Sequence, residues 1–459
     1  MHCSKNATNT YFKTWTLVWS PMKSKPDAPH LLTASEAGTL IAARQLTSEE
    51  LVGSCLDHIA LREPVVRAWS HLDPKQAMRA ARSCDATAPL GPLHGIPVAV
   101  KDVIDAFDMP TGMGSPIYDG YRPRADAACV ATLRAAGAVI LGKTVTAEFA
   151  GVSSGPTTNP LAATRTPGGS SSGSAAAVAA KMVPIALGTQ TGGSILRPAS
   201  FCGIVGFKPS FGTVNRAGLK LAAEALDTIG LMARDIDDIV LFWGALVGRG
   251  SAPLAPRKTP PRLALFRSHH WNRATADTVA AVEGTARRLE ADGAVVEELP
   301  LPDRFAELSQ ARTVINGYER ARALAWEWAH HRDQISPMMS QTLAQGWSFS
   351  CESYLAAIRV AEHWRSWFTD AMEHGRYDGV ITAAVNGEAP EGLVSTGDAS
   401  FQEIWTILHV PTITLPLSVG RTGLPIGVQF VGRRLADEAL LSLAKWVMQR
   451  SVPVPAGLG

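Results

Sequence analysis

The sequence lacks the features typical of membrane proteins and of small secreted proteins. No apolar run of eighteen or more residues occurs in its 459 positions, so no transmembrane helix is expected. It has only six cysteines, and no two of them have the C-x-x-C spacing of metal or redox sites. A chain of this length can bury a large core without disulfides, so we expect reduced thiols in a cytoplasmic protein.

The charge balance argues against a second group of functions. The chain has 43 lysines and arginines against 41 aspartates and glutamates, a formal net charge of +2. No basic stripe occurs, so no nucleic-acid partner is expected. The twelve histidines show no H-E-x-x-H pattern, and the adjacent pairs His269–His270 and His330–His331 suggest exposure on two sides rather than a shared metal. We therefore expect no metal and no cofactor.

Glycine, serine and alanine are abundant in one stretch, residues 167–209. It contains two Gly-Gly-Ser turns, at 168–170 and 192–194, separated by an alanine-rich segment that predicts a helix and then a short strand. Upstream, Lys101 follows an apolar run, residues 96–100, that predicts a buried strand. Glycine adopts backbone conformations closed to other residues, so such turns can bring amide N–H groups close to a substrate.

These features fit one kind of chemistry. A serine hydroxyl is a poor nucleophile until a neighbouring base takes its proton. Lysine can be that base only when neutral, because an ammonium group has no lone pair, and burial lowers the pKa of a lysine. The stretch therefore predicts a serine hydrolase with Lys101 as the base, hydroxyls from Ser170 and Ser194, and backbone amides near 190–194 facing a developing oxyanion.

Simpler interpretations exist for each feature taken alone. Residues 168–174 could be a flexible Gly/Ser linker. Residues 169–173 match the G-x-S-x-G nucleophile elbow formally, but the preceding residues 163–167 are poor strand formers. A lone lysine at a strand end is usually a surface residue. The order and spacing of the three features favour the hydrolase.

The same residues resemble the amidase-signature hydrolases. Ser170 lies 69 residues after Lys101, and Ser194 lies 24 residues after Ser170, which are spacings of that family. Further segments also look like family segments: residues 89–105, 135–150, 226–238 and 423–432.

The resemblance implies a role for each catalytic position. Ser194 matches the nucleophile, Lys101 matches the terminal base, and Ser170 matches the bridging serine, whose preceding peptide bond is cis in this family. A short segment near the catalytic centre is expected to bind substrate. The backbone amides that match the oxyanion hole are those of Thr191, Gly192, Gly193 and Ser194. The segment expected to bind substrate is Phe149, Ala150 and Gly151.

Two positions depart from the family pattern. Gln190 stands where the family usually has aspartate, so a fixed negative charge near the turn is missing. Arg197 comes one residue late, because Leu196 is inserted after Ile195.

The fold implied by the resemblance is α/β, a single large domain with a mixed twisted β-sheet covered by α-helices on both faces. Residues 1–29 are expected to be a poorly ordered extension without a secretory signal, and residues 30–459 the amidase domain, with 250–400 as the variable substrate-specificity region. Capping boxes at Thr33 and Thr47 predict two helix starts. Residues 304–376 are helical by pattern.

The expected function is hydrolysis of a small-molecule carboxylic amide through an acyl-enzyme, by a monomer or homodimer. Five tryptophans between 326 and 367 suggest either helix packing or an aromatic wall that favours hydrophobic or aryl amides; esters and carbamates (urethanes) are further candidates. One alternative is the glutaminase subunit of a tRNA-dependent amidotransferase, whose variable region has a tyrosine-rich helix where residues 354–363 hold a single tyrosine. Another is a non-catalytic binding relative.

Overall fold

The computed structural model describes residues 27–250, 252–255 and 257–451, and its strands form one large sheet. Most of the expected extension, residues 1–26, lies outside the described residues. The strands are β1 (Trp69–Leu72), β2 (Pro97–Lys101), β3 (Val139–Thr144), β4 (Ile185–Gln190), β5 (Val205–Lys208), β6 (Thr228–Ala233), β7 (Arg262–Leu265), β8 (Val295–Glu298), β9 (Gly379–Ala383), β10 (Thr412–Val419) and β11 (Pro425–Val431).

The sheet has eleven strands in the order β1-β3-β2-β4-β6-β5-β10-β11-β9-β7-β8. It is mixed: β2 is parallel to β3 and β4, whereas β6, β10 and β11 run antiparallel to their neighbours. The central strands are buried along their whole length, as their nearly continuous apolar sequences predict for strands covered on both faces. This confirms the expected fold class.

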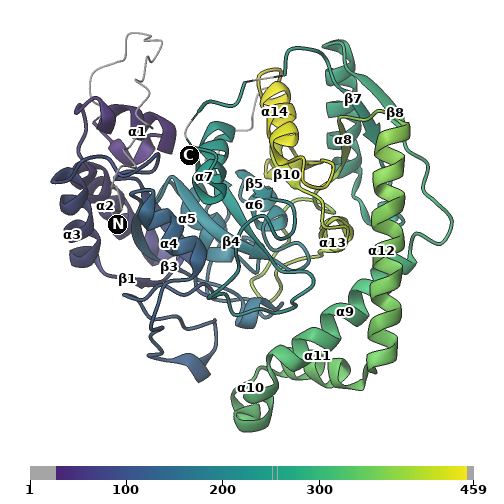
Figure 1. Cartoon of the computed structure of the whole chain (residues 1–459), viewed down its shortest axis with the longest axis horizontal. Coiled ribbons are helices and arrows are strands. Elements are labelled where there is room, and N and C mark those ends of the chain that lie inside the picture. The colour runs from purple at the N-terminus through teal and green to yellow at the C-terminus, as the bar shows by residue number, and fades with distance from the viewer. Residues whose placement is uncertain (1–26, 251, 256, 452–459) are drawn as a thin grey trace, which may run out of the picture.

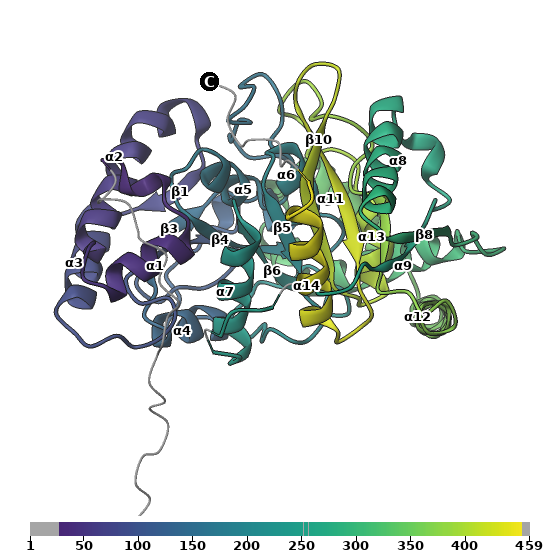
Figure 2. The ribbon, with the colours of Figure 1, turned by 90° about the horizontal axis from the view of Figure 1, so that it is seen from above.

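Helices cover both faces of the sheet. Seen from above, α5, α6 and α8 lie on one side of the strands and α1, α4, α7 and α14 on the other (Figure 2). The helices are α1 (Ala34–Ala42), α2 (Ser48–Val66), α3 (Pro74–Asp85), α4 (Ala128–Ala135), α5 (Ser172–Ala179), α6 (Leu196–Phe201), α7 (Ile236–Val247), α8 (Ala276–Ala291), α9 (Glu307–Ala323), α10 (Ala325–His330), α11 (Pro337–Ser348), α12 (Cys351–His374), α13 (Ser400–Ile407) and α14 (Asp437–Met448).

Local sequence signals set several of these boundaries. Both predicted capping boxes form: Thr33 and Thr47 each accept a hydrogen bond from the backbone of the glutamate three residues later, whose side chain bonds back. The small side chains of α5 allow the helix to pack closely against the middle of the sheet, and every residue of the helix is buried.

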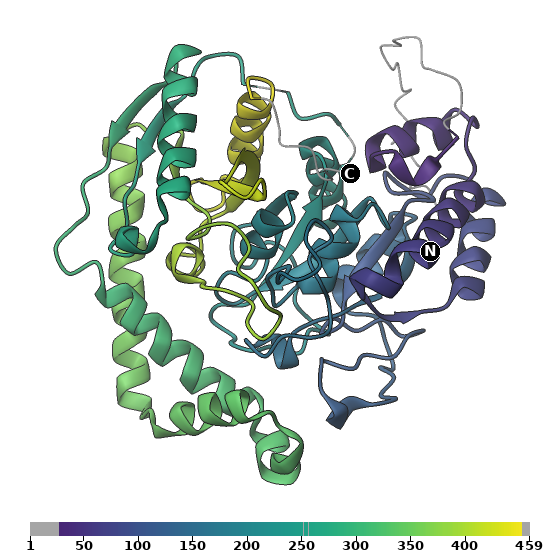
Figure 3. The ribbon, with the colours of Figure 1, turned by 180° about the vertical axis from the view of Figure 1, so that it is seen from behind.

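Helices α9 to α12 form an arm that extends away from the sheet. The arm lies at the right of Figure 1, with α10 at its tip. From behind, it lies at the opposite end of the molecule from α1 to α3 (Figure 3). This is the helical region expected at 304–376.

The tryptophans of the arm divide between helix packing and solvent exposure. Trp364 is 4% exposed, and its ring meets those of Phe305 and Trp367 edge to face, with centroids 5.0 and 5.7 Å apart. Trp326 and Trp347 instead face solvent, at 53% and 42% exposure. The contacts therefore favour helix packing over an aromatic wall.

Two broad features of the described residues bear on the sequence expectations. No helix in them combines the length and apolar character needed to cross a membrane. Their five cysteines are free thiols: Cys55, Cys84, Cys129, Cys202 and Cys351.

Replacing Trp364 with leucine is expected to lower the free energy of unfolding by about 2–4 kcal/mol, because a buried ring leaves a cavity. Its indole Nε1 has no hydrogen-bond partner within the described residues, so the loss is one of packing. Trp347→Leu is the matched control at an exposed site, with an expected change under about 1 kcal/mol. Chemical denaturation measures both; equal losses would contradict the packing assignment.

Candidate active site

Lys101 ends β2 in the interior of the protein. Its side chain is fully buried, and Nζ lies 2.7 Å from Ser170 Oγ and 2.7 Å from Thr189 Oγ1. Burial lowers the pKa of Lys101 to about 7; the charge of Asp227 opposes this shift and that of Arg320 adds to it. A large fraction of this amine is therefore neutral near pH 7.

The first Gly-Gly-Ser turn leads into α5. The Gly169–Ser170 peptide bond is cis, as the resemblance implied. The carbonyl of Ser170 accepts a hydrogen bond from the amide of Ala147, at 3.1 Å. The hydroxyl of the next residue, Ser171, lies 3.2 Å from both the amide and the carbonyl of Thr189. These bonds fix the turn against β4 and against the segment before residue 149.

The second Gly-Gly-Ser turn leads from β4 into α6. Ser194 is 6% exposed, and its carbonyl accepts a hydrogen bond of 3.3 Å from the amide of Ser171. The structure thus brings the two serine turns and the lysine together, although they are far apart in the sequence.

The side chain of Gln190 fixes the second turn through hydrogen bonds. Its Oε1 accepts hydrogen bonds from the amides of Ile195 (2.9 Å) and Leu196 (3.1 Å), where α6 begins. Its Nε2 donates to Thr406 Oγ1 at 3.0 Å, and that hydroxyl donates to the carbonyl of Gly192 at 2.7 Å. An amide oxygen therefore serves as the acceptor without a negative charge, and the amide nitrogen adds a link to α13.

Arg197 still reaches the first turn despite its shifted place in the sequence. Its Nη2 donates to the carbonyl of Gly169 at 2.6 Å and to Thr396 Oγ1 at 3.0 Å. Burial lowers the pKa of Arg197 to about 10, so it remains charged at neutral pH.

The predicted oxyanion residues lie in a tightly packed turn. Thr191 Oγ1 donates to Asp227 Oδ1 at 2.5 Å. A Cβ on Gly193 would clash with Gln402 Oε1, and one on Gly192 would lie 2.7 Å from Arg312 Nη2. A side chain at either glycine would therefore have to displace the end of Arg312 or of Gln402, both of which pack closely on this turn.

The predicted substrate segment lies beside the first turn. Phe149 and Ala150 have φ values of 46° and 56°, within the short 3₁₀ helix Glu148–Ala150. The carbonyl of Phe149 accepts a hydrogen bond from Arg320 Nη1 at 2.9 Å, and a Cβ on Gly151 would lie 2.5 Å from Met339 Cε. Phe149 is 2% exposed, and its ring packs edge-on against Tyr118, so the side chain anchors the segment in the protein interior.

Sequence reasoning missed several residues of this site. Thr189 lies in a segment whose pattern predicted a strand and nothing more. Asp227 lies in the family-like segment 226–238, but no role was assigned to it. Arg312 and Arg320 lie in the variable region, where local sequence carries no positional signal.

The expectation for His269 and His270 was wrong. Both rings turn to the same hydroxyl, with Nε2 atoms 3.0 and 3.1 Å from Ser309 Oγ. The rings are 3.8 Å apart between centroids, and both are partly buried. The packing of α9 against the loop at 268–271 brings them to one side, which local sequence cannot indicate. No group of three or more potential metal ligands occurs in the residues the structure describes.

Comparisons with known proteins agree with this arrangement. The sequence profile of the Amidase family matches residues 50–441. The chain is 35% identical to a subunit of the Glutamyl-tRNA(Gln) amidotransferase of Symbiobacterium thermophilum, over 92% of this chain and 96% of that protein.

Solved structures show the same fold. Native peptide amidase from Stenotrophomonas maltophilia superposes with a TM-score of 0.80 at 28% identity, over 93% of this chain and 98% of that one. Fatty acid amide hydrolase, at 21% identity, shares the fold with a TM-score of 0.83, over 93% and 86% of the two chains. This chain therefore belongs to the amidase family and is an amide-hydrolysing enzyme.

Proposed function

We propose that this enzyme cleaves carboxylic amides through a relay of Ser194, Ser170 and Lys101, with an acyl-enzyme intermediate. The observation that carries the proposal is the buried Lys101 amine, 2.7 Å from Ser170 Oγ, with its pKa lowered to about 7. A neutral amine at this place has the lone pair that a general base needs.

The acylation step transfers protons toward Lys101 and then back to the leaving group. Lys101 takes the proton of Ser170 as Ser170 takes that of Ser194, and Ser194 Oγ attacks the substrate carbonyl carbon. The negative charge that forms on the carbonyl oxygen is stabilised by backbone amides of 191–194. The proton then returns through Ser170 to the leaving nitrogen, the C–N bond breaks, and the amine departs.

Water completes the cycle by the same relay. It gives a proton toward Lys101 through Ser170, attacks the acyl carbon, and releases the carboxylic acid as Ser194 regains its proton. All groups in these steps belong to the chain, the substrate or water. Esters and carbamates present the same acyl carbonyl and are further candidate substrates.

The finer substrate expectations have unequal support. The preference for hydrophobic or aryl amides rested mainly on the tryptophans of the arm. Trp364 and Trp367 pack helices, and Trp326 and Trp347 face solvent, so these four give it no support. The amidotransferase alternative has support in the 35% identity to a subunit of a glutamyl-tRNA(Gln) amidotransferase. The difference is testable, because a stand-alone hydrolase acts on simple amides without other subunits.

The purified chain alone is expected to hydrolyse simple amides, and Ser194→Ala is expected to lower kcat by at least about 10⁴-fold. Ser170→Ala and Lys101→Ala should each lose several orders of magnitude, and the double variant should lose little more, because the relay acts as a unit. A fluorophosphonate probe should label the wild type and not Ser194→Ala. More than about a tenth of the activity in Ser194→Ala would disprove the nucleophile.

The pH dependence follows from the direction of the Lys101 shift. Below about pH 7 the amine is protonated and cannot act as a base, so kcat/KM should rise with pH through about 7 and level off above it. Asp227→Asn should move this rise to lower pH, because the charge of Asp227 raises the pKa of Lys101. A rate that falls steadily from pH 6 to pH 9, in protein still folded by circular dichroism, would contradict a lysine base.

Thr189 is expected to position the lysine. Thr189→Val removes a hydroxyl 2.7 Å from Lys101 Nζ and should lower kcat/KM about tenfold, the equivalent of one hydrogen bond of about 1.4 kcal/mol. Thr189→Ser keeps the hydroxyl and should restore most of the rate. If the serine variant were as slow as the valine variant, the loss would come from packing and not from this hydrogen bond.

A further inference from the structure

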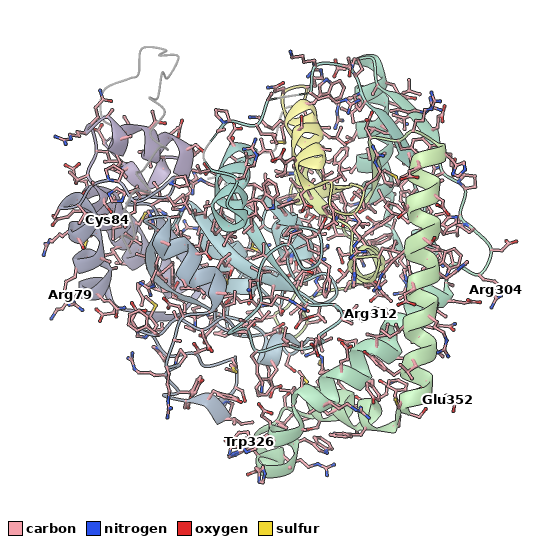
Figure 4. All side chains as sticks on the ribbon, viewed as in Figure 1. Arg79, Cys84, Arg304, Arg312, Trp326 and Glu352 are labelled. Atoms are coloured by element: carbon pink, nitrogen blue, oxygen red, sulfur yellow. The ribbon has the colours of Figure 1, made fainter. Side chains whose placement is uncertain are left out.

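One charged side chain of the arm reaches the predicted oxyanion turn. Arg312 lies on α9, where the arm meets the body of the protein, far from Trp326 at the tip and Glu352 on the outer side (Figure 4). Its Nη2 would be 2.7 Å from a Cβ on Gly192. The mechanism above uses no group of Arg312, so its place beside this turn calls for another role.

The guanidinium of Arg312 is only partly engaged by protein. Nη1 forms an ion pair with Glu403 Oε2 at 3.2 Å, and the two side chains are 19% and 15% exposed. Nε is buried and has no hydrogen-bond partner within the described residues. The Nε and Nη2 donors point along one edge of the guanidinium, the fork that binds a carboxylate through two parallel hydrogen bonds.

The surroundings add positive charge. Arg197 and Arg320 are almost fully buried nearby, and burial lowers the pKa of each to about 10; Asp398 opposes this shift at Arg197 and Asp227 opposes it at Arg320, whereas the charge of Arg312 adds to both shifts. Asp227 is buried among hydrogen-bond donors, accepting from the Thr191 hydroxyl and from the amides of Ala222 and Ala223.

The other acidic groups here already have partners. Asp398 pairs with Arg273 at 3.3 Å, and Glu403 pairs with Arg312. His270 Nε2 is 3.9 Å from Glu403 Oε1, and burial lowers the pKa of His270 while Glu403 opposes the shift. An anion that reached the unpaired Nε–Nη2 edge of Arg312 would lie among four arginines (197, 273, 312 and 320) and three carboxylates (Asp227, Asp398 and Glu403).

We propose that Arg312 is a specificity-determining residue that binds a carboxylate of the substrate through its Nε–Nη2 edge, so that the preferred amides carry an anionic group a few atoms from the scissile carbonyl. This inference rests on the proposed function, since it takes the turn at 191–194 as the place of that carbonyl. It replaces the expected preference for hydrophobic amides. The carboxylate can belong to the acyl side or to the amine side of the substrate.

Two pairs of neutral and anionic amides test the inference. For the acyl side the pair is succinamate and 4-oxopentanamide; for the amine side it is N-acetylglycine and N-acetonylacetamide. In each pair a methyl ketone replaces the carboxylate at similar size. We expect the wild type to favour the anionic member of at least one pair by tenfold or more in kcat/KM.

Variants then assign the preference to Arg312. Arg312→Gln should reduce the anionic preference at least tenfold, mainly through KM, and Arg312→Lys, which keeps the charge without the fork, should retain part of it. Glu403→Gln should keep or raise the preference, because a competing carboxylate is removed. The matched control is Arg322→Gln, an exposed arginine of the same helix, which should leave the preference unchanged.

Several results would overturn the inference. One is a wild type that favours the neutral member of both pairs, or turns over none of the four amides while a fluorophosphonate still labels Ser194. Another is an Arg312→Gln variant, folded by circular dichroism, that loses the same factor on both members of a pair. Loss of labelling in the wild type would instead signal failure of the proposed mechanism.

Discussion

The burial of one amine is the constraint on which the site depends. Lys101 has two hydroxyls, of Ser170 and Thr189, at 2.7 Å and no ion-pair partner among the residues that the structure describes. A carboxylate against the amine would hold it protonated, whereas neutral hydroxyls leave burial to lower its pKa. The parallel pairing of β2 and β4, with Val100 opposite Leu187, brings the end of β2 next to the end of β4, where Thr189 contacts Lys101.

The arm is held in place by polar contacts that end close to this site. Arg320 donates to the carbonyl of Phe149, next to the first serine turn. At the tip, the buried carboxylate of Glu327 pairs with Lys220 of the body. Such buried groups are costly without their partners, so these contacts fix the arm in one position. Arg312 is thereby held beside the turn with part of its hydrogen-bonding capacity unused.

Local sequence signals predicted that Lys101 and the two serine turns belong to one site, but they did not indicate the residues that surround them. The useful signals were local: the glycine pairs, the lysine after an apolar run, their spacing, and the two capping boxes. Each of them can be recognised from the sequence itself, without knowledge of how distant segments pack. The contact of Thr189 with Lys101 depends on strand register, and that of Arg312 with Gly192 depends on how α9 packs. The His269–His270 pair was misjudged for the same reason, since a helix far along the chain supplies the hydroxyl that both rings share.

The residues at the two positions that depart from the expected family pattern both form hydrogen bonds within the site. Gln190 accepts from the two amides at the start of α6 as a carboxylate would, so the turn is held without a charge. Arg197, one residue late, still reaches the carbonyl of Gly169 from within α6. Removing a negative charge from the end of β4 has a further consequence: each nearby carboxylate stabilises the protonated lysine, so its absence favours the neutral amine. An amide at position 190 thus suits the proposed role of Lys101 as a base near neutral pH.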